Sequence, residues 1–289
     1  MVIDFRIRPP FKSFLELGII KTWQSAGNIA DPRLQKPTGF ERQPVPSVDE
    51  GSIDLMIKEM DEAGVTHGVI MGRQTHNPVY GDTLHSDVYE LTEKYPGRFS
   101  GFVGICPHSP TAVEEIEDCV KKYHIKGVSV DGGWCNPPIY FDDPSMVPIF
   151  DACQQYNLIL TLTMSSFLGP DLTYSDPTRL MPILKKFNKV KVVFAHGCWP
   201  KVAEVLGVAM QCPNVYVSPD CYFYVREMPM FQEYARAANS WLKYRFLFAT
   251  SYPIRGFKQS IENWKNRGLE KEALERSLYY NAAELLQLI

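Results

Sequence analysis

VKVVFAHGCWPKVAEVLGVAMQCPNVYVS, residues 190–218, is the stretch in which the pattern of the fold is clearest. It begins with a short apolar run, Val190–Ala195, and ends with another, Val215–Ser218. Nearly continuous apolar runs of this length are typical of strands that are buried on both faces of a parallel sheet. Between them, Pro200 precedes a segment of helical period, as prolines often do at a first helical turn. The stretch therefore predicts a strand, a helix and a second strand.

The same alternation extends over the whole chain. The apolar runs are Val2–Ile7, Thr66–Met71, Phe99–Ile105, Gly127–Val130, Leu158–Thr163, Val190–Ala195, Val215–Ser218 and Arg245–Thr250. Strict alternation of strands and helices implies right-handed crossovers and a parallel sheet, either closed into a barrel or open and doubly wound. A glycine-rich phosphate loop after the first strand would favour the open sheet, but that strand leads into Arg8, Pro9 and Pro10. We therefore expect an α/β fold, a (β/α)8 TIM barrel.

The chain length fits one barrel with a long insertion. A barrel takes about 250 residues, and the chain has 289. Most of the surplus falls in residues 11–46, a proline-rich stretch without periodicity that is too long for an ordinary connection between a strand and a helix. We expect residues 1–289 to form a single domain in which this long loop after the first strand is a lid over the site.

Composition excludes several classes of partner. Thirty basic and thirty-three acidic side chains leave a net charge of -3, which gives no reason to expect binding to nucleic acid or to an anionic membrane. No apolar run approaches the roughly 18 residues of a membrane span, and the N-terminus lacks the apolar region of a signal peptide. The seven cysteines contain no C-x-x-C pair. We expect a cytoplasmic protein with reduced cysteines, possible as a homodimer on base rates alone.

Candidate site residues follow from the barrel, because catalytic side chains in this fold stand at the C-terminal ends of the strands. In chain order they are Arg6, Arg8, Arg73, Asp131, Trp134, Thr163, His196, Asp220, Tyr222 and Ser251. His76, His108 and Tyr252 are further candidates for the walls of the pocket, without an assigned role.

Four segments carry a resemblance to a known family. They are Ile3–Arg8, Tyr140–Pro144, Val192–Gly197 and Arg245–Pro253. In order and spacing they resemble the amidohydrolase superfamily, and within it the amidohydrolase-2 group, which includes aminocarboxymuconate-semialdehyde decarboxylase and 2-pyrone-4,6-dicarboxylate lactonase. The resemblance covers nearly the whole chain and implies the same barrel with hydrolase or decarboxylase chemistry.

The sequence departs from that family at the metal ligands. The family's first strand reads Asp-x-His-x-His, and its two histidine positions are Arg6 and Arg8 here. A ligand histidine of the fifth strand would fall at or next to Thr163, and the aspartate of the Thr-Asp-Tyr-Pro motif is replaced by Ser251. Arginine stays protonated and offers no lone pair, and one remaining histidine is too few for a zinc site. We expect no metal and no cofactor; the pyrone-dicarboxylate lactonase is the family's precedent for catalysis without metal.

Two interpretations of the arginines remain open. Burying an unpaired charge costs several kcal/mol, so Arg6, Arg8 and Arg73 could form internal salt bridges with Asp4, Asp131 or Asp220. Alternatively, they converge on a small anionic, carboxylate-bearing molecule, which guanidinium groups bind through paired hydrogen bonds. Arg6 and Arg8 are two residues apart on one strand and therefore project to the same side.

The remaining candidates also have two interpretations. His196 is either a general base with Asp220 as its partner or a hydrogen-bonded core histidine. Asp131, followed by two glycines, approaches a ligand or belongs to a plain turn. Thr163 and Ser251 are small fillers or substrate contacts. A serine nucleophile is disfavoured, since no Gly-x-Ser-x-Gly motif is present.

The sequence thus favours an amidohydrolase-related, metal-independent enzyme that hydrolyses a small anionic compound or cleaves or decarboxylates it as a lyase would. The alternatives are a catalytically silent barrel that binds an anion, and a metal-dependent hydrolase with substitute ligands such as His76, His196 and Asp220.

Overall fold

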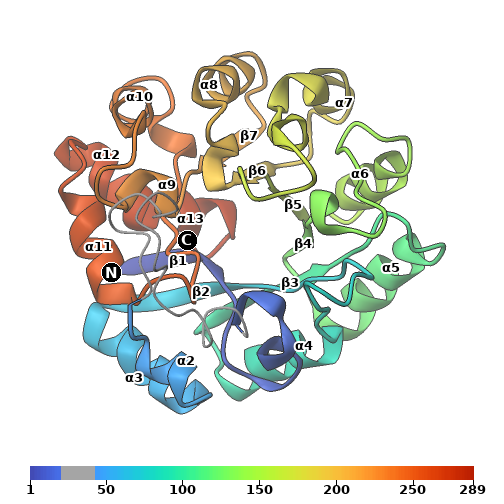
Figure 1. Cartoon of the computed structure of the whole chain (residues 1–289), viewed down its shortest axis with the longest axis horizontal. Coiled ribbons are helices and arrows are strands. Elements are labelled where there is room, and N and C mark those ends of the chain that lie inside the picture. The colour runs from blue at the N-terminus through green and yellow to red at the C-terminus, as the bar shows by residue number, and fades with distance from the viewer. Residues whose placement is uncertain (21–42) are drawn as a thin grey trace, which may run out of the picture.

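Seven parallel strands form one curved sheet in the computed structural model, which describes residues 1–20 and 43–289. The strands are adjacent in sequence order, so that each pairs with the next along the chain. They are β1 (Val2–Ile7), β2 (Val65–Met71), β3 (Phe99–Gly104), β4 (Gly127–Val130), β5 (Ile159–Thr163), β6 (Val192–Ala195) and β7 (Val215–Ser218). The helices surround the sheet (Figure 1). The expected TIM-barrel fold is confirmed.

The eighth predicted strand, Arg245–Thr250, lies in the right place but is not a regular strand. Leu247 donates its N–H to Val217 of β7 at 3.0 Å, and Phe5 of β1 donates to the carbonyl of Phe248 at 3.1 Å. The segment therefore lies between β7 and β1. Two of its other N–H groups have partners outside the sheet, because Phe248 donates to Ser277 and Thr250 donates to the Asp4 carboxylate, both at 3.0 Å. Since these two donors do not bond to a neighbouring strand, the segment does not continue the ladder, and the prediction of a regular strand was wrong.

Most of the helices cover the outside of the sheet, whereas α9 (Cys221–Tyr224) lies inside their ring and contributes to the cavity described below (Figure 1). The other described helices are α2 (Pro46–Asp49), α3 (Ile53–Ala63), α4 (His85–Lys94), α5 (Ala112–Tyr123), α6 (Met146–Gln155), α7 (Met181–Lys186), α8 (Val202–Gln211), α10 (Phe231–Ala238), α11 (Phe257–Lys265), α12 (Lys271–Glu275) and α13 (Asn281–Leu285). The helix α8 begins two residues after Pro200, as the quoted stretch predicts. None of the described helices combines the length and apolar character needed to cross a membrane.

Most of the hydrophobic core of the described residues lies in two clusters. A large cluster fills the space between strands and helices, and a smaller one brings together apolar residues of the strands, including Phe5, Val69 and Phe102. The rings of Phe5 and Phe102 meet edge to face with their centroids 5.8 Å apart. Full burial of such side chains stabilises the fold by about 1.5–3 kcal/mol each. Leu286, after α13, packs on the same cluster.

Most of the predicted long loop lies outside the described residues. Of residues 11–46, the structure describes 11–20 and 43–46. Lys12–Glu16 form one 3-10 helix, and the residues Gly18 and Ile19 reach the wall of the cavity described below. The lid and the single-domain organisation stay predictions.

Candidate active site

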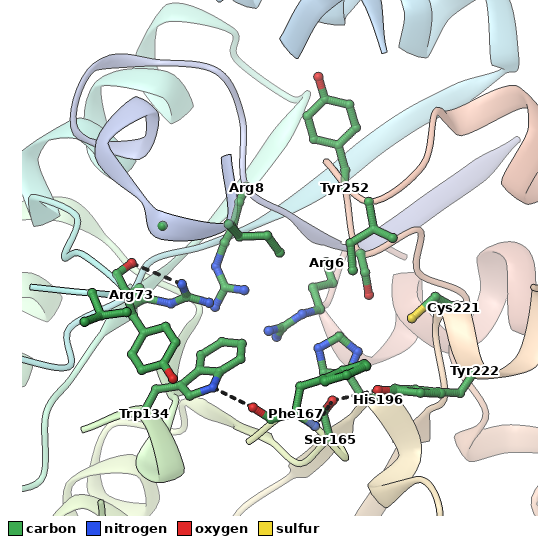
Figure 2. A pocket seen from close by; sticks show the side chains of 16 residues that line it. Arg6, Arg8, Arg73, Trp134, Ser165, Phe167, His196, Cys221, Tyr222 and Tyr252 are labelled. Atoms are coloured by element: carbon green, nitrogen blue, oxygen red, sulfur yellow. Dashed lines mark hydrogen bonds between the residues drawn. The ribbon is translucent and has the colours of Figure 1, made fainter. Parts of the chain in front are cut away.

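A cavity of about 300 Å³ lies where the strand ends and the loops after them meet. Seven of the ten predicted site residues line it, namely Arg6, Arg8, Arg73, Trp134, His196, Tyr222 and Ser251 (Figure 2). The other three, Asp131, Thr163 and Asp220, are buried beside it and contact the lining residues. The structure therefore brings together side chains that are spread over most of the sequence.

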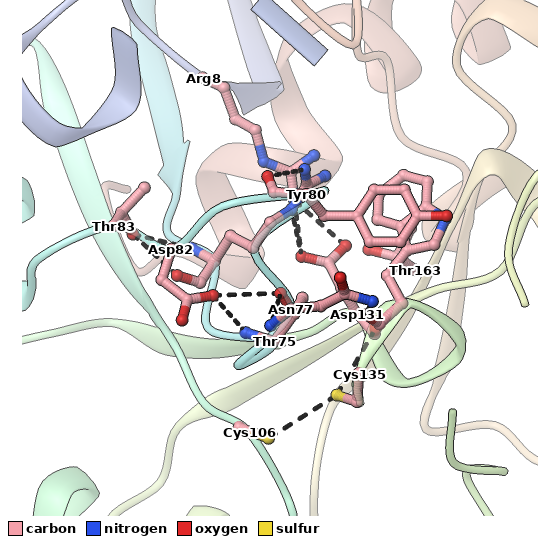
Figure 3. Close-up of polar contacts among 12 residues, drawn as sticks. Arg8, Thr75, Asn77, Tyr80, Asp82, Thr83, Cys106, Asp131, Cys135 and Thr163 are labelled. Carbon is pink, nitrogen blue, oxygen red and sulfur yellow. Dashed lines mark hydrogen bonds and ion pairs between the residues drawn. The ribbon is translucent and has the colours of Figure 1, made fainter. Parts of the chain in front are cut away.

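Asp131, just after β4, connects the arginines. Arg8 Nη2 donates to both of its carboxylate oxygens, Oδ1 at 3.1 Å and Oδ2 at 2.9 Å (Figure 3). Arg73 Nε donates to Oδ2 at 3.2 Å, and Arg6 Nη2 lies 3.8 Å from Oδ1. Arg6 Nη2 also donates to Thr163 Oγ1 at 3.1 Å. The arginines therefore do form internal salt bridges, as the first interpretation expects, and Asp131 is their main partner.

The arginine cluster (Arg6, Arg8 and Arg73) nevertheless has more hydrogen-bond donors than the surrounding acceptors pair with. Arg6 Nη1, Arg8 Nε and Arg73 Nη2 are buried and have no hydrogen-bond partner among the described residues. A buried donor left unpaired costs about 1–3 kcal/mol, and more when it is charged. Figure 2 shows the three guanidinium groups converging on the cavity. Three cations and incomplete pairing are the features of an anion site.

The pKa values of these groups reflect burial first and mutual charge second. Burial, with repulsion from Arg8, lowers the pKa of Arg73 to about 9 and that of Arg6 to about 10. Burial acts in the opposite direction on Asp131, but the three arginines outweigh it and hold the pKa of that carboxyl below its usual value. Asp131 is consequently ionised at neutral pH and cancels part of the positive charge.

His196 and Asp220 form a second polar group beside the cluster. Nδ1 of His196 lies 3.3 Å from Oδ2 of Asp220, which also accepts a hydrogen bond from Ser251 Oγ at 2.8 Å. Ser218 donates to the other oxygen. Burial raises the pKa of Asp220 to about 6, although Arg6 and the two hydroxyls oppose the change. Burial, together with the arginine charges, holds the pKa of His196 well below its usual value, so its imidazole is neutral.

The backbone of this group is strained. His196, Asp220 and Ser251 have φ angles of 66°, 53° and 54°, in the left-handed region that non-glycine residues rarely adopt. Gly197, next to His196, has a φ of 58°. Strained residues that converge from three separate segments are typical of functional sites, where the surrounding structure holds them in place.

Aromatic side chains form the rest of the wall. Trp134 stacks on the guanidinium of Arg73, whose Cζ lies 4.4 Å from the ring centroid, and its Nε1 donates to the Phe167 carbonyl at 2.9 Å. Tyr80 also stacks on Trp134, with the two ring centroids 5.1 Å apart. The Tyr222 hydroxyl lies 2.8 Å from Ser165 Oγ. A flat, unsaturated ligand fits such a wall better than a bulky one.

Several lining residues were missed from the sequence, and two predicted wall residues do not line the cavity. The missed residues include Ile19, Val79, Tyr80, Ser165, Phe167, Cys221 and Ile254; most belong to loops and turns, whereas Ile19 is helical and Cys221 begins α9. Nothing in their local pattern distinguishes them from their neighbours. His76 and His108 are exposed and outside the lining, so their assignment to the wall was wrong, whereas Tyr252 lines the cavity as predicted.

The residues do not fit the family's metal. Guanidinium groups of Arg6 and Arg8 occupy the cavity where the resemblance places two histidine ligands, and a cation there would meet three positive charges. Among residues 1–20 and 43–289, no three His, Cys, Asp or Glu side chains are grouped closely enough to hold a metal ion. His76, one of the substitute ligands suggested from the sequence, does not line the cavity.

The sequence model of the family described as Amidohydrolase matches residues 20–288. The solved structure of an uncharacterized TIM-barrel protein from Bordetella bronchiseptica is 31% identical, with a TM-score of 0.87 over 99% of this chain and 98% of that chain. No curated protein sequence matches the chain.

Two more distant structures share the fold. A probable 2-pyrone-4,6-dicarboxylic acid hydrolase from Acinetobacter baumannii, solved with citric acid bound, is 16% identical with a TM-score of 0.67 over 99% of each chain. A 5-carboxyvanillate decarboxylase from Sphingomonas paucimobilis is 15% identical with a TM-score of 0.67 over 99% of this chain and 98% of that chain. At these identities the likeness shows the fold alone.

Proposed function

Because the chain belongs to the amidohydrolase family, we propose that it is a metal-independent enzyme that hydrolyses a small anionic, carboxylate-bearing compound. The observation that carries the proposal is the arginine cluster with three unpaired buried donors, next to a neutral histidine that faces a carboxylate at 3.3 Å. The relatives described as a dicarboxylic acid hydrolase and a carboxyvanillate decarboxylase act on carboxylates, which supports this substrate class.

The arginine cluster orients the substrate. The carboxylate accepts hydrogen bonds from the guanidinium groups that Asp131 leaves incompletely paired. Trp134 and Tyr222 pack against the flat part of the molecule, and both line the cavity. Because the reacting carbonyl is held in one position beside His196, the reaction between substrate and base becomes effectively unimolecular.

His196 acts as the general base. Its neutral imidazole accepts a proton from a water molecule as the water oxygen bonds to the substrate carbonyl carbon. The carbonyl electrons move to oxygen, and an arginine N–H stabilises that oxyanion. When the carbon–oxygen bond to the leaving group breaks, the imidazolium returns the proton to the leaving alkoxide. Asp220 stabilises the imidazolium in between, from 3.3 Å.

Substrate binding also tunes the base. The arginine charges help to lower the pKa of His196 in the free protein. A bound carboxylate offsets those charges, so that the pKa of His196 rises toward neutrality when substrate is present. A base with a pKa near the operating pH transfers protons best, and the shift occurs only in the productive complex.

The proposal is tested by a screen of carboxylate-bearing lactones and esters with purified protein, with the metal content determined by elemental analysis. We expect turnover that survives chelation, and a loss of about 100-fold or more in kcat for His196→Ala with an unchanged circular dichroism spectrum. The His67→Ala variant is the control, since His67 is bonded to Gly97 and Ser100 away from the cavity.

Three outcomes would contradict the proposal. Stoichiometric zinc or manganese that is required for activity would favour the alternative of a metal-dependent hydrolase. Ligand-induced stabilisation without turnover of any compound would favour a silent anion-binding barrel. Release of carbon dioxide instead of hydrolysis would make the enzyme a decarboxylase.

A further inference from the structure

The ionisable side chains around the cavity nearly cancel. In the described part of the chain, the charged side chains that line it, or that form an ion pair with one that does, are the arginine cluster, Asp131 and Asp220, and His196 lines it as well. Three cations and two carboxylates leave one positive charge when His196 is neutral, as its burial dictates. A site with three arginines therefore has an excess of only one charge.

The protonation state of Asp4 also affects the net charge near the cavity. Asp4 precedes Arg6 by two residues on β1, accepts hydrogen bonds from the N–H groups of Arg6 and Thr250, and is fully buried. Burial raises its pKa to about 7. When Asp4 is protonated the excess is one positive charge, and when it is ionised the excess is zero. Neither state leaves the two or three positive charges that a dianion or trianion would require.

The walls give a second anion no partner. Apart from the arginines and His196, the cavity is lined mainly by apolar and aromatic side chains such as Ile19, Trp134 and Phe167, with hydroxyl groups from Tyr80, Ser165, Tyr222, Ser251 and Tyr252. A carboxylate directed at these walls would lose much of its water and meet hydroxyl groups at most, without a cation to balance its charge. Figure 2 shows the guanidinium groups of Arg8 and Arg73 beside Trp134 and that of Arg6 on the side of His196.

We infer that the site is selective for monocarboxylates, and that Asp131 is the residue that sets this selectivity by neutralising one arginine. The inference rests on the proposed function for its ligand class and names the charge of the substrate. Asp131 is a positioning and specificity residue, because it contacts the arginines and does not line the cavity. Its carboxylate balances part of the arginine charge, and one ligand carboxylate can balance the rest.

The test is equilibrium binding, by calorimetry at pH 7.5, where Asp220 is ionised, and at fixed ionic strength, of three ligands with the same flat ring: benzoate, isophthalate and trimesate. They are ionised at this pH and carry one, two and three negative charges. We expect the wild-type protein to bind benzoate at least tenfold more tightly than isophthalate, and trimesate most weakly. In Asp131→Asn, which keeps the shape of the side chain and removes its charge, we expect isophthalate to bind more tightly than benzoate.

The matched control is Asp118→Asn, which removes the same charge from α5, where Asp118 pairs with Lys122 on the exposed surface. It should leave the order of the three ligands unchanged. Wild-type protein that binds isophthalate or trimesate as tightly as benzoate, or that binds none of the three, would overturn the inference. The wild-type comparison decides even if Asp131→Asn does not fold.

Binding and turnover separate this inference from the proposed function. Monocarboxylate-selective binding without hydrolysis of any compound would contradict the enzyme and leave the selectivity intact. Hydrolysis of dicarboxylates in preference to matched monocarboxylates would contradict the selectivity and leave the enzyme intact.

Discussion

Arg8 Nη2 donates to both carboxylate oxygens of Asp131, at 3.1 and 2.9 Å, although 123 residues separate the two in sequence. Both side chains are almost completely buried. A buried pair contributes little net stability, since desolvation offsets the attraction, but removing one partner leaves an uncompensated charge. This contact thus joins the end of β1 to the end of β4, while other donors of the arginine cluster stay unpaired.

We predict that Arg8→Met costs about 3 kcal/mol of the free energy of unfolding, because Asp131 then loses its best partner. The double variant Arg8→Met/Asp131→Asn should lose less than the sum of the two single variants, by at least about 1 kcal/mol. Urea denaturation of all four proteins measures this coupling. Additive losses would show that the pair is not coupled.

Gly104, at the end of β3, determines where Arg73 sits. A Cβ at this position would lie 2.3–2.4 Å from the backbone atoms of Arg73. We predict that Gly104→Ala displaces Arg73, lowers stability by about 2 kcal/mol or more, and weakens benzoate binding. Gly207→Ala in α8 is the control, because nothing lies within 4 Å of the added carbon, and it should stabilise the protein by about 0.5–1 kcal/mol. Unchanged stability and binding in Gly104→Ala would contradict the prediction.

The raised pKa of Asp4 makes its contribution to stability depend on pH. Burial raises the pKa from 3.8 to about 7, so the folded state holds a proton that the unfolded state has lost. This contribution is fully favourable below pH 3.8 and is lost as pH rises to about 7. We predict that Asp4→Asn gains about 2 kcal/mol relative to the wild type between pH 5 and pH 8. Urea unfolding at the two pH values measures the gain, and a constant difference would contradict it.

Asp220 should control the acid limb of activity. Its pKa is raised to about 6, and its ionised form stabilises the imidazolium of His196. We predict that kcat/KM of the wild type falls as pH drops through about 6, and that Asp220→Asn lowers kcat/KM about 100-fold and removes this limb. Ser251→Ala, which deletes one hydrogen bond to Asp220, should lose less activity and keep the limb. A limb that persists in Asp220→Asn would assign it to another group.

Much of the fold could be predicted because local patterns carry it. The bounds of β1, β4 and β7 agree with the apolar runs in the sequence, since strands buried on both faces consist of continuous apolar residues. The segment Arg245–Thr250 has the same pattern, yet it is not regular. Two of its N–H groups, those of Phe248 and Thr250, donate to Ser277 and to the Asp4 carboxylate, and Thr250 and Asp4 are 246 residues apart in sequence. Local pattern cannot reveal such partners.

Periodicity and residue type, which are local properties of the sequence, were enough to predict the α/β barrel and the residues at its strand ends. The resemblance to the amidohydrolase family identified Arg6 and Arg8 as replacements of two expected histidines. The pairing of the charges became visible only in the tertiary structure. Asp131 contacts Arg8 and Arg73 while their remaining donors stay unpaired, and His76 stays outside the cavity. Electrostatic balance depends on distances between strands, and closure of the barrel sets those distances.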